Sequence, residues 1–203
     1  MKTQIRNLLR AAEYVLVFIG VWALGYWSCV LLSTKVYQVI EGREFSRALQ
    51  AKAPRDAYIL AVPPAAKPRP KERAGAAVIG RLTIPRVGLS TIVVEGVGDR
   101  DLRFAAGHIP GTSLPGQRGN VGMAGHRDTF FRPLHRIRKN DAITVTTLNG
   151  EFGYRVVSTE IVGPEDVQVL YSTKNETLTL ITCYPFNFVG PAPKRFIVRA
   201  ERL

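Results

Sequence analysis

Cys183 is the residue of this sequence best suited to covalent chemistry. It ends the β-prone run TLTLITC, and the only other cysteine, Cys29, lies in an apolar stretch. A free cysteine has a pKa of about 8.5, so a nucleophilic thiol needs a neighbour that stabilises the thiolate or removes the proton. Arginines and three histidines can supply this help. An inert thiol packed in a strand is the alternative. The histidines are His108, His126 and His135.

Arg195 can meet Cys183 if the chain turns back on itself. It opens a β-prone run after the proline-rich loop YPFNFVGPAPK. If that run returns as an antiparallel neighbour, the two side chains lie at the same end of adjacent strands. Arginine does not deprotonate in proteins, so it offers fixed donors where negative charge develops. A surface charge on the last strand is the alternative.

Short β-prone runs separated by Gly and Pro predict that residues 76–203 are mainly β. Asn149 and Gly150 lie between two runs and form the favoured signal for a type I′ hairpin. Seven or more strands with only short helical segments predict a closed barrel or a sandwich. The runs are Arg81 to Ile84, Thr91 to Glu95, Asn120 to Gly125, Ala142 to Leu148, Phe152 to Val162, Thr177 to Cys183 and Arg195 to Leu203. The helical segments are Asp101 to Phe104, Thr129 to Leu134 and Glu165 to Leu170.

Residues 14–32 predict a transmembrane helix. They carry no charge, and at about 1.5 Å rise per residue they cover roughly the 30 Å hydrocarbon core. A cleavable signal peptide has a shorter apolar region and a small-residue cleavage site, neither of which is present. A buried core helix is the other alternative. The short basic tail, residues 1–13, and the long following domain favour a cytoplasmic N terminus with the domain outside the plasma membrane.

Residues 33–75 predict a juxtamembrane helix followed by a spacer. Helical spacing continues for a few turns, and prolines then alternate with lysines and arginines between residues 63 and 73. Such a stretch is extended and semi-rigid. The net charge is +12, and most of the excess precedes residue 76. A solvated linker near anionic lipid explains this charge better than nucleic-acid binding, because no recognition-helix pattern is present.

Three segments of the sequence resemble the sortases, a family of cysteine transpeptidases that attach surface proteins to cell walls. Thr179 to Cys183 matches the family's TLxTC signature, Gly119 to Leu134 resembles the segment that carries its histidine, and Lys194 to Val198 resembles the strand that carries its arginine. The resemblance covers residues 76–203. It implies a closed β-barrel of about eight strands with short helices, preceded by the transmembrane helix.

The resemblance also implies catalytic roles. Cys183 is the nucleophile that forms a thioester, which divides one acyl transfer into two easier steps. His126 is the general acid and base that serves the departing and incoming amines. Arg195 is the donor that steadies the oxyanion or the bound peptide.

Three further residues are accessory candidates. His108 matches a recurrent sortase histidine that lies near the groove without carrying the chemistry. Asp128 can orient a ring nitrogen of His126, with helix capping or a salt bridge as the alternative. Thr182 can support the groove or the oxyanion, although β propensity alone also explains a threonine there. His135 is expected to be a solvated loop residue.

Within the family, class D is the group that the sequence resembles most, with class E as the alternative. The resemblance implies cleavage of an LPxTG-like sorting signal between Thr and Gly. The cleaved protein is then transferred to an amine of the cell envelope, such as a peptidoglycan peptide or another surface protein. We expect membrane lipid as a further partner, no nucleic acid, and no obligatory cofactor or metal cluster. The sequence leaves regulatory Ca²⁺ open.

Two alternative functions fit the sequence less well. Another wall-directed cysteine enzyme needs a Ser-x-Gly-Cys motif or a cysteine at a helix start, and the residues around Cys183 offer neither. A catalytically silent, membrane-tethered β-barrel that binds wall peptides has no need of Cys183, His126 and Arg195 together. The transpeptidase is therefore the favoured hypothesis.

Overall fold

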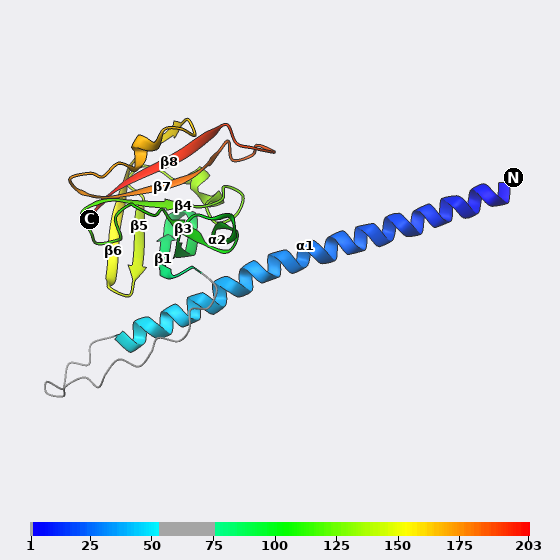
Figure 1. Cartoon of the computed structure of the whole chain (residues 1–203), viewed down its shortest axis with the longest axis horizontal. Helices are drawn as coiled ribbons and strands as arrows, with labels where there is room; N and C mark the ends of the chain where they lie inside the picture. Colours follow the sequence, from blue (N-terminus) through cyan, green and yellow to red (C-terminus); the bar gives the residue numbers. More distant parts are fainter. Residues whose placement is uncertain (1, 53–75) are drawn as a thin grey trace. The chain divides into compact units, whose positions relative to one another are not determined.

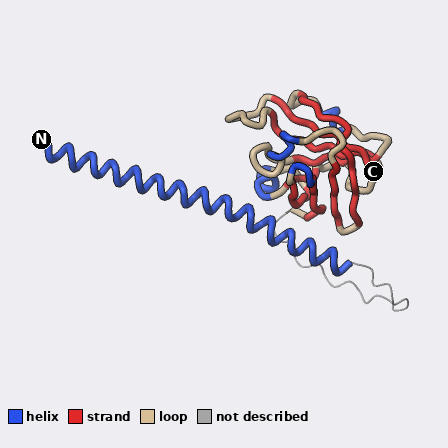
Figure 2. The backbone as a smooth tube through the Cα atoms, turned by 180° about the vertical axis from the view of Figure 1, so that it is seen from behind, coloured by secondary structure: helices blue, strands red, loops and turns tan. Residues whose placement is uncertain are grey.

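The structure is a computed structural model that describes residues 2–52 and 76–203 (Figures 1 and 2). The expected proline-rich spacer, with its expected lack of packing between Pro63 and Gly75, lies outside the described residues. The elements are helix α1 (Lys2–Lys52), strand β1 (Val78–Ile84), turn η1 (Pro85–Val87), β2 (Leu89–Glu95), helix α2 (Asp99–Phe104), β3 (Ala106–His108), β4 (Gly119–Ala124), turn η2 (Arg132–Arg136), β5 (Ala142–Thr147), β6 (Gly150–Val162), turn η3 (Val167–Leu170), β7 (Glu176–Tyr184) and β8 (Lys194–Arg202).

Helix α1 carries the apolar run that was predicted to span a membrane. The helix is long and apolar enough for this by length and composition. Large apolar side chains along it are exposed, including Trp22, Leu24 and Trp27. This exposure contradicts the alternative of a core helix, because a core helix packs such side chains inside the protein. Helix α1 is therefore a candidate membrane span.

The eight strands form a closed barrel, as the sequence predicted. Their order around the barrel is β1-β2-β3-β4-β7-β8-β6-β5. Two neighbouring pairs are parallel, β2 with β3 and β4 with β7, and the other six are antiparallel. The predicted hairpin joins β5 to β6, with Thr147 opposite Gly150. Each of the seven predicted runs overlaps a strand.

The barrel interior is filled by alternate residues of the strands. Along β1, Leu82 and Ile84 are buried while Thr83 between them is more exposed, and β5 repeats the pattern with Ile143 and Val145. All four of these buried residues belong to one hydrophobic cluster. Complete burial of such a side chain stabilises the fold by about 1.5–3 kcal/mol. The interior also contains Tyr154, and burial raises the pKa of its hydroxyl.

Among the strands that the structure describes, β3 is the one that the sequence did not predict. It has only three residues, and its pairing with β2 is parallel, with Val93 opposite Ala106. A Cβ atom at Gly107 would lie 2.1 Å from the Gly96 carbonyl oxygen. Only a glycine permits this close approach of the two segments. Because glycine has a low β propensity, the sequence gives no local signal for a strand here.

An ion pair fixes turn η1 to the start of β5. The Arg86 guanidinium donates to both carboxylate oxygens of Asp141. The Arg138 backbone N–H also donates to Asp141, at 2.7 Å. The Asp141 side chain is only 6% exposed. The hydrogen bond from Arg86 lowers the pKa of this carboxyl group, so it stays ionised in its buried position.

Candidate active site

The ends of β4, β7 and β8 lie side by side and carry the residues singled out by the sequence (Figure 1). Strands β4 and β7 are parallel, with Ala124 opposite Ile181. The two strands have the same rise per residue, so His126, two residues beyond Ala124, lies beside Cys183, two residues beyond Ile181. Strands β7 and β8 are antiparallel, and Cys183 lies opposite Arg195. The predicted pairing of Cys183 with Arg195 is confirmed.

Thr182 extends the pairing of β4 with β7 beyond the end of β4. Its hydroxyl donates to the Gly125 carbonyl at 2.7 Å, and the Gly125 N–H donates to the Ile181 carbonyl at 3.2 Å. Thr182 is only 2% exposed, so water does not compete for this bond. His126 directly follows Gly125, and Cys183 directly follows Thr182. Thr182 therefore holds the two segments together.

A tight turn fixes the backbone of His126. The Phe131 N–H donates to the His126 carbonyl at 3.1 Å, and Phe131 is completely buried in the core. A Cβ atom at Gly125 would lie 2.8 Å from the Phe131 ring. Glycine at this position lets the turn pack directly on the buried ring, which links the His126 backbone to the hydrophobic core.

Cys183, His126 and Arg195 are all partly exposed. Cys183 is a free thiol. Within the part of the chain that the structure describes, the His126 ring has no hydrogen-bond partner. A thiol and an imidazole that are both accessible and uncommitted can contact a ligand that lies across the strand ends.

Arg195 is held by the loop that precedes it. Its Nη1 donates to the carbonyls of Ala192, at 3.2 Å, and Lys194, at 3.1 Å. Among the described residues, its Nη2 and Nε have no partner. The guanidinium is thus fixed on one side, while donors on its other side remain available to a ligand.

Asp128 is exposed, two residues after His126. No hydrogen bond or ion pair joins its carboxylate to the residues that the structure describes. An orienting role for Asp128 stays a prediction.

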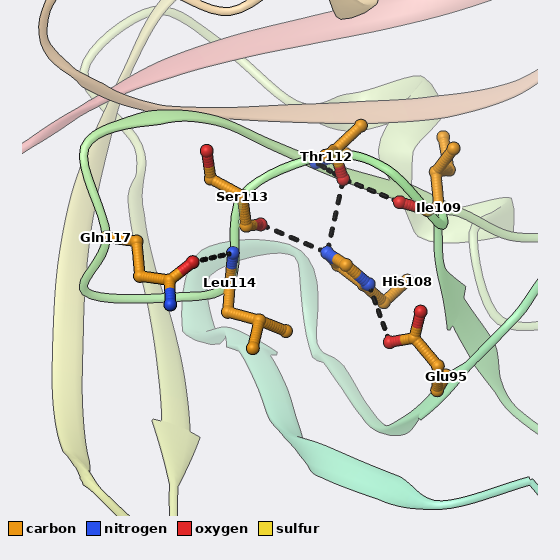
Figure 3. Close-up of polar contacts among 8 residues, drawn as sticks. Glu95, His108, Ile109, Thr112, Ser113, Leu114 and Gln117 are labelled. Carbon is orange, nitrogen blue, oxygen red and sulfur yellow. Dashed lines mark hydrogen bonds and ion pairs between the residues drawn. The ribbon is translucent and has the colours of Figure 1, made fainter.

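His108 is a buried and fully bonded histidine (Figure 3). Its Nδ1 lies 2.8 Å from Glu95 Oε2, and its Nε2 lies 3.0 Å from the Ser113 carbonyl oxygen and 3.1 Å from the Thr112 hydroxyl. The Thr112 hydroxyl donates to the Ile109 carbonyl, so it accepts from the ring. With acceptors at both ring nitrogens, His108 links β2, β3 and the following loop as a structural residue.

A cleft of about 500 Å³ begins at the residue after Cys183. Its walls are aromatic and basic, and none of its lining residues is acidic. His135 is exposed, as predicted, but it lies in η2 and its ring packs edge-on against Phe186 at 5.9 Å. The Phe186 ring also packs edge-on against the rings of Tyr184 and Phe196. The residues that line the cleft are Arg132, His135, Tyr184, Pro185, Phe186 and Asn187.

Residues 82–203 match the family model described as the sortase domain. This match covers more than half of the chain. The chain belongs to the sortase family. The three motifs that suggested the family all lie within the matched residues.

Several sortases are similar to this chain in sequence or in structure. Sortase D of Bacillus subtilis (strain 168) is 38% identical over 125 residues, which are 61% of this chain and 63% of that protein. Sortase A from Corynebacterium diphtheriae has a similar solved structure, with a TM-score of 0.60 and 30% identity over 64% of this chain and 63% of that chain. A sortase D5 transpeptidase of Clostridium perfringens gives a TM-score of 0.57 and 30% identity over 62% of this chain and 79% of that chain. This chain thus spans less than two thirds of the length of the Bacillus subtilis relative.

Sequence reasoning missed two side chains whose contacts join separate segments of the barrel domain. Glu95 pairs with His108, but their strands meet through a parallel pairing that no spacing in the sequence reveals. Arg127 donates to the loop after Cys183. Its position directly after His126 was the available signal.

Proposed function

We propose that this protein is a membrane-anchored cysteine transpeptidase of the class D type. The alignment of His126, Cys183 and Arg195 on three neighbouring strand ends carries the proposal. The similarity to sortase D of Bacillus subtilis supports the class. These three side chains supply a general acid and base, a nucleophile and a hydrogen-bond donor to the oxyanion, which acyl transfer through a thioester requires.

The first half-reaction cleaves an LPxTG-like sorting signal between Thr and Gly. The Cys183 thiolate attacks the Thr carbonyl carbon, and the negative charge on the carbonyl oxygen is stabilised by Arg195. As the C–N bond breaks, protonated His126 gives its proton to the departing Gly amine. The product is a thioester between Cys183 and the Thr carboxyl carbon, together with the released Gly peptide.

The second half-reaction transfers the acyl group to an amine of the cell envelope, such as a peptidoglycan peptide or another surface protein. The amine attacks the thioester carbonyl, and neutral His126 removes its proton. The C–S bond breaks, and the Cys183 thiolate and the His126 imidazolium are restored. One peptide bond is broken and one is formed, so the cycle is redox-neutral and consumes no cofactor.

The proposed topology has a single membrane span. Residues 1–13 are cytoplasmic, residues 14–32 span the plasma membrane, and residues 33–75 form the juxtamembrane helix and spacer. Residues 76–203 form the catalytic domain outside the membrane. The exposed apolar side chains of α1 support the span, and the basic N-terminal tail supports the orientation.

The test is cleavage of a fluorogenic LPxTG peptide by the full chain in detergent micelles, with and without triglycine as the amine. Wild type is expected to cleave the peptide and to form an amine-dependent ligation product. Cys183→Ala is expected to do neither, because no thioester can form.

The matched control is Cys29→Ala, which removes the other thiol of the chain. It is expected to retain wild-type cleavage and ligation, because Cys29 lies in the apolar run of α1. Equal loss of activity in both variants, or retained ligation in Cys183→Ala, would contradict the proposal. A folded wild type that cleaves no member of a sorting-signal peptide library would instead favour a silent binding module.

A further inference from the structure

Arg127 makes contacts that the proposed mechanism does not use. Its Nη1 donates to the Pro185 carbonyl at 3.2 Å, and its Nη2 donates to the carbonyls of Phe188, at 2.8 Å, and Gly190, at 2.9 Å. The guanidinium carbon also lies 5.9 Å from the centre of the Phe188 ring. One side chain on the segment that carries His126 therefore binds three carbonyls of the loop between β7 and β8, residues 185–193.

The β7–β8 loop has few other hydrogen bonds. Among the described residues, one backbone hydrogen bond lies within the loop, from the Phe188 N–H to the Pro185 carbonyl at 3.4 Å. The loop tip is exposed, and Val189 is 95% exposed. Three backbone carbonyls that point at one place repel each other unless a cation lies between them. Arg127 supplies that cation, so it is the main polar support of the first half of the loop.

The β7–β8 loop in turn supports two parts of the site. Pro185 and Phe186 line the cleft that begins beside Cys183. Near the other end of the loop, the Ala192 carbonyl accepts from Arg195. A change at the Pro185 end of the loop, which Arg127 holds, therefore alters the cleft wall first, because Arg195 is held separately by the carbonyls of Ala192 and Lys194.

We propose that Arg127 is a positioning residue that holds the β7–β8 loop in the shape required to bind the peptide substrate. This inference rests on the proposed function for its kinetic part, while its structural part, the support of the loop, does not. Arg127 acts through the loop and does not contact the reacting atoms. The guanidinium reaches these carbonyls through two separate nitrogens of a rigid planar fork, whereas a lysine ammonium has three donors on a single atom and does not reproduce that spacing.

The kinetic test compares Arg127→Ala and Arg127→Lys with wild type, using the full chain in detergent and the LPxTG peptide. Both variants are expected to raise KM about ten-fold with a smaller change in kcat, because substrate binding is lost more than chemistry. The rate of Cys183 alkylation by iodoacetamide, measured with Cys29→Ala in the background, should stay within about two-fold of wild type, since a small reagent does not use the cleft. Wild-type KM in both variants, or full rescue by lysine, would overturn the inference.

The structural test needs no activity. Chymotrypsin cuts after aromatic residues, and Phe186 and Phe188 stand in the loop. Both Arg127 variants should be cut there about ten-fold faster than wild type, because cleavage follows the population of the opened loop. The control is Arg118→Lys, an exposed arginine at the other end of β4, which should change neither KM nor the cutting rate.

The two failures are distinguishable. A wild type without peptide cleavage would refute the proposed function, and the rate of chymotrypsin cutting would still decide whether Arg127 holds the loop. An unchanged cutting rate in both variants would refute the role of Arg127, whatever the activity of the wild type.

Discussion

Two histidines on neighbouring parts of the barrel differ in what surrounds them. His108, on β3, is 2% exposed and has acceptors at both ring nitrogens. His126, just beyond β4, is partly exposed, and its ring has no hydrogen-bond partner among the described residues. A histidine that is fully bonded cannot exchange protons with a substrate, whereas an uncommitted one can. The difference separates a structural histidine from a candidate catalytic one.

His126→Ala is expected to cause the largest loss of activity among the substitutions that test this contrast. Removal of a general acid and base costs about 10²–10⁴-fold in kcat, and the fold should be unaffected because the ring makes no described hydrogen bond. The measurement is peptide cleavage together with thermal unfolding followed by circular dichroism. A variant with wild-type kcat would remove His126 from the mechanism.

Arg195→Ala should cost less than the loss of His126. Removal of one donor to a developing oxyanion costs about 10²–10³-fold in kcat. Arg195→Lys separates the effect of charge from that of geometry. Lysine keeps the positive charge but lacks the guanidinium that Arg195 anchors on the carbonyls of Ala192 and Lys194. If Arg195→Ala raises KM alone, its role is to bind the peptide and not to stabilise the oxyanion.

His108→Ala is expected to give the opposite result to His126→Ala. It leaves the Glu95 carboxylate and the Ser113 carbonyl without their partner and empties a buried position. The free energy of unfolding should fall by about 2–3 kcal/mol, while kcat stays within about three-fold of wild type at a temperature where the variant is folded. Urea unfolding measures the first quantity and peptide cleavage the second. A kcat loss comparable to that of His126→Ala would end the distinction between the two histidines.

Asp141→Asn should give the smallest effect, a loss of about 1–2 kcal/mol of stability at pH 7. The folded-state pKa of Asp141 is lowered by the hydrogen bond from Arg86. A lowered pKa means that this stabilisation is complete above the unfolded-state pKa of about 4 and is lost as the pH falls through the folded-state value.

The stability difference between wild type and Asp141→Asn should therefore be constant from about pH 5 to 7 and shrink below about pH 4. Urea unfolding at several pH values measures it. A difference that grows on acidification would contradict the assigned direction of the pKa shift.

Much of the barrel could be predicted from the sequence, because its long strands follow a local pattern. β-prone runs bounded by Gly and Pro predicted β1 and β5, and Asn149 and Gly150 predicted the hairpin that joins β5 to β6. The short loop between the runs that end at Cys183 and begin at Arg195 predicts that these two residues lie on adjacent strands, and the pairing confirms this. Local signals of this kind do not depend on distant partners.

The features that escaped prediction depend on distant partners. Strand β3 is defined by its close approach to β2, and its Gly107 has no β propensity of its own. The pairing of Glu95 with His108 and the contacts of Arg127 join segments that the sequence does not show to be neighbours. The sequence shows each of these residues, but only the three-dimensional structure shows which residue it contacts.

Intact-mass spectrometry of the full chain, after rapid acid quench during turnover of an LPxTG peptide, tests directly whether Cys183 forms the thioester. If Cys183 is the nucleophile, an adduct with the mass of the peptide acyl group forms, is located on Cys183 by digestion and is released by hydroxylamine as a thioester. Turnover without this adduct in wild type and in the slowed His126→Ala variant, or an adduct on another residue, would contradict the claim that Cys183 is the nucleophile.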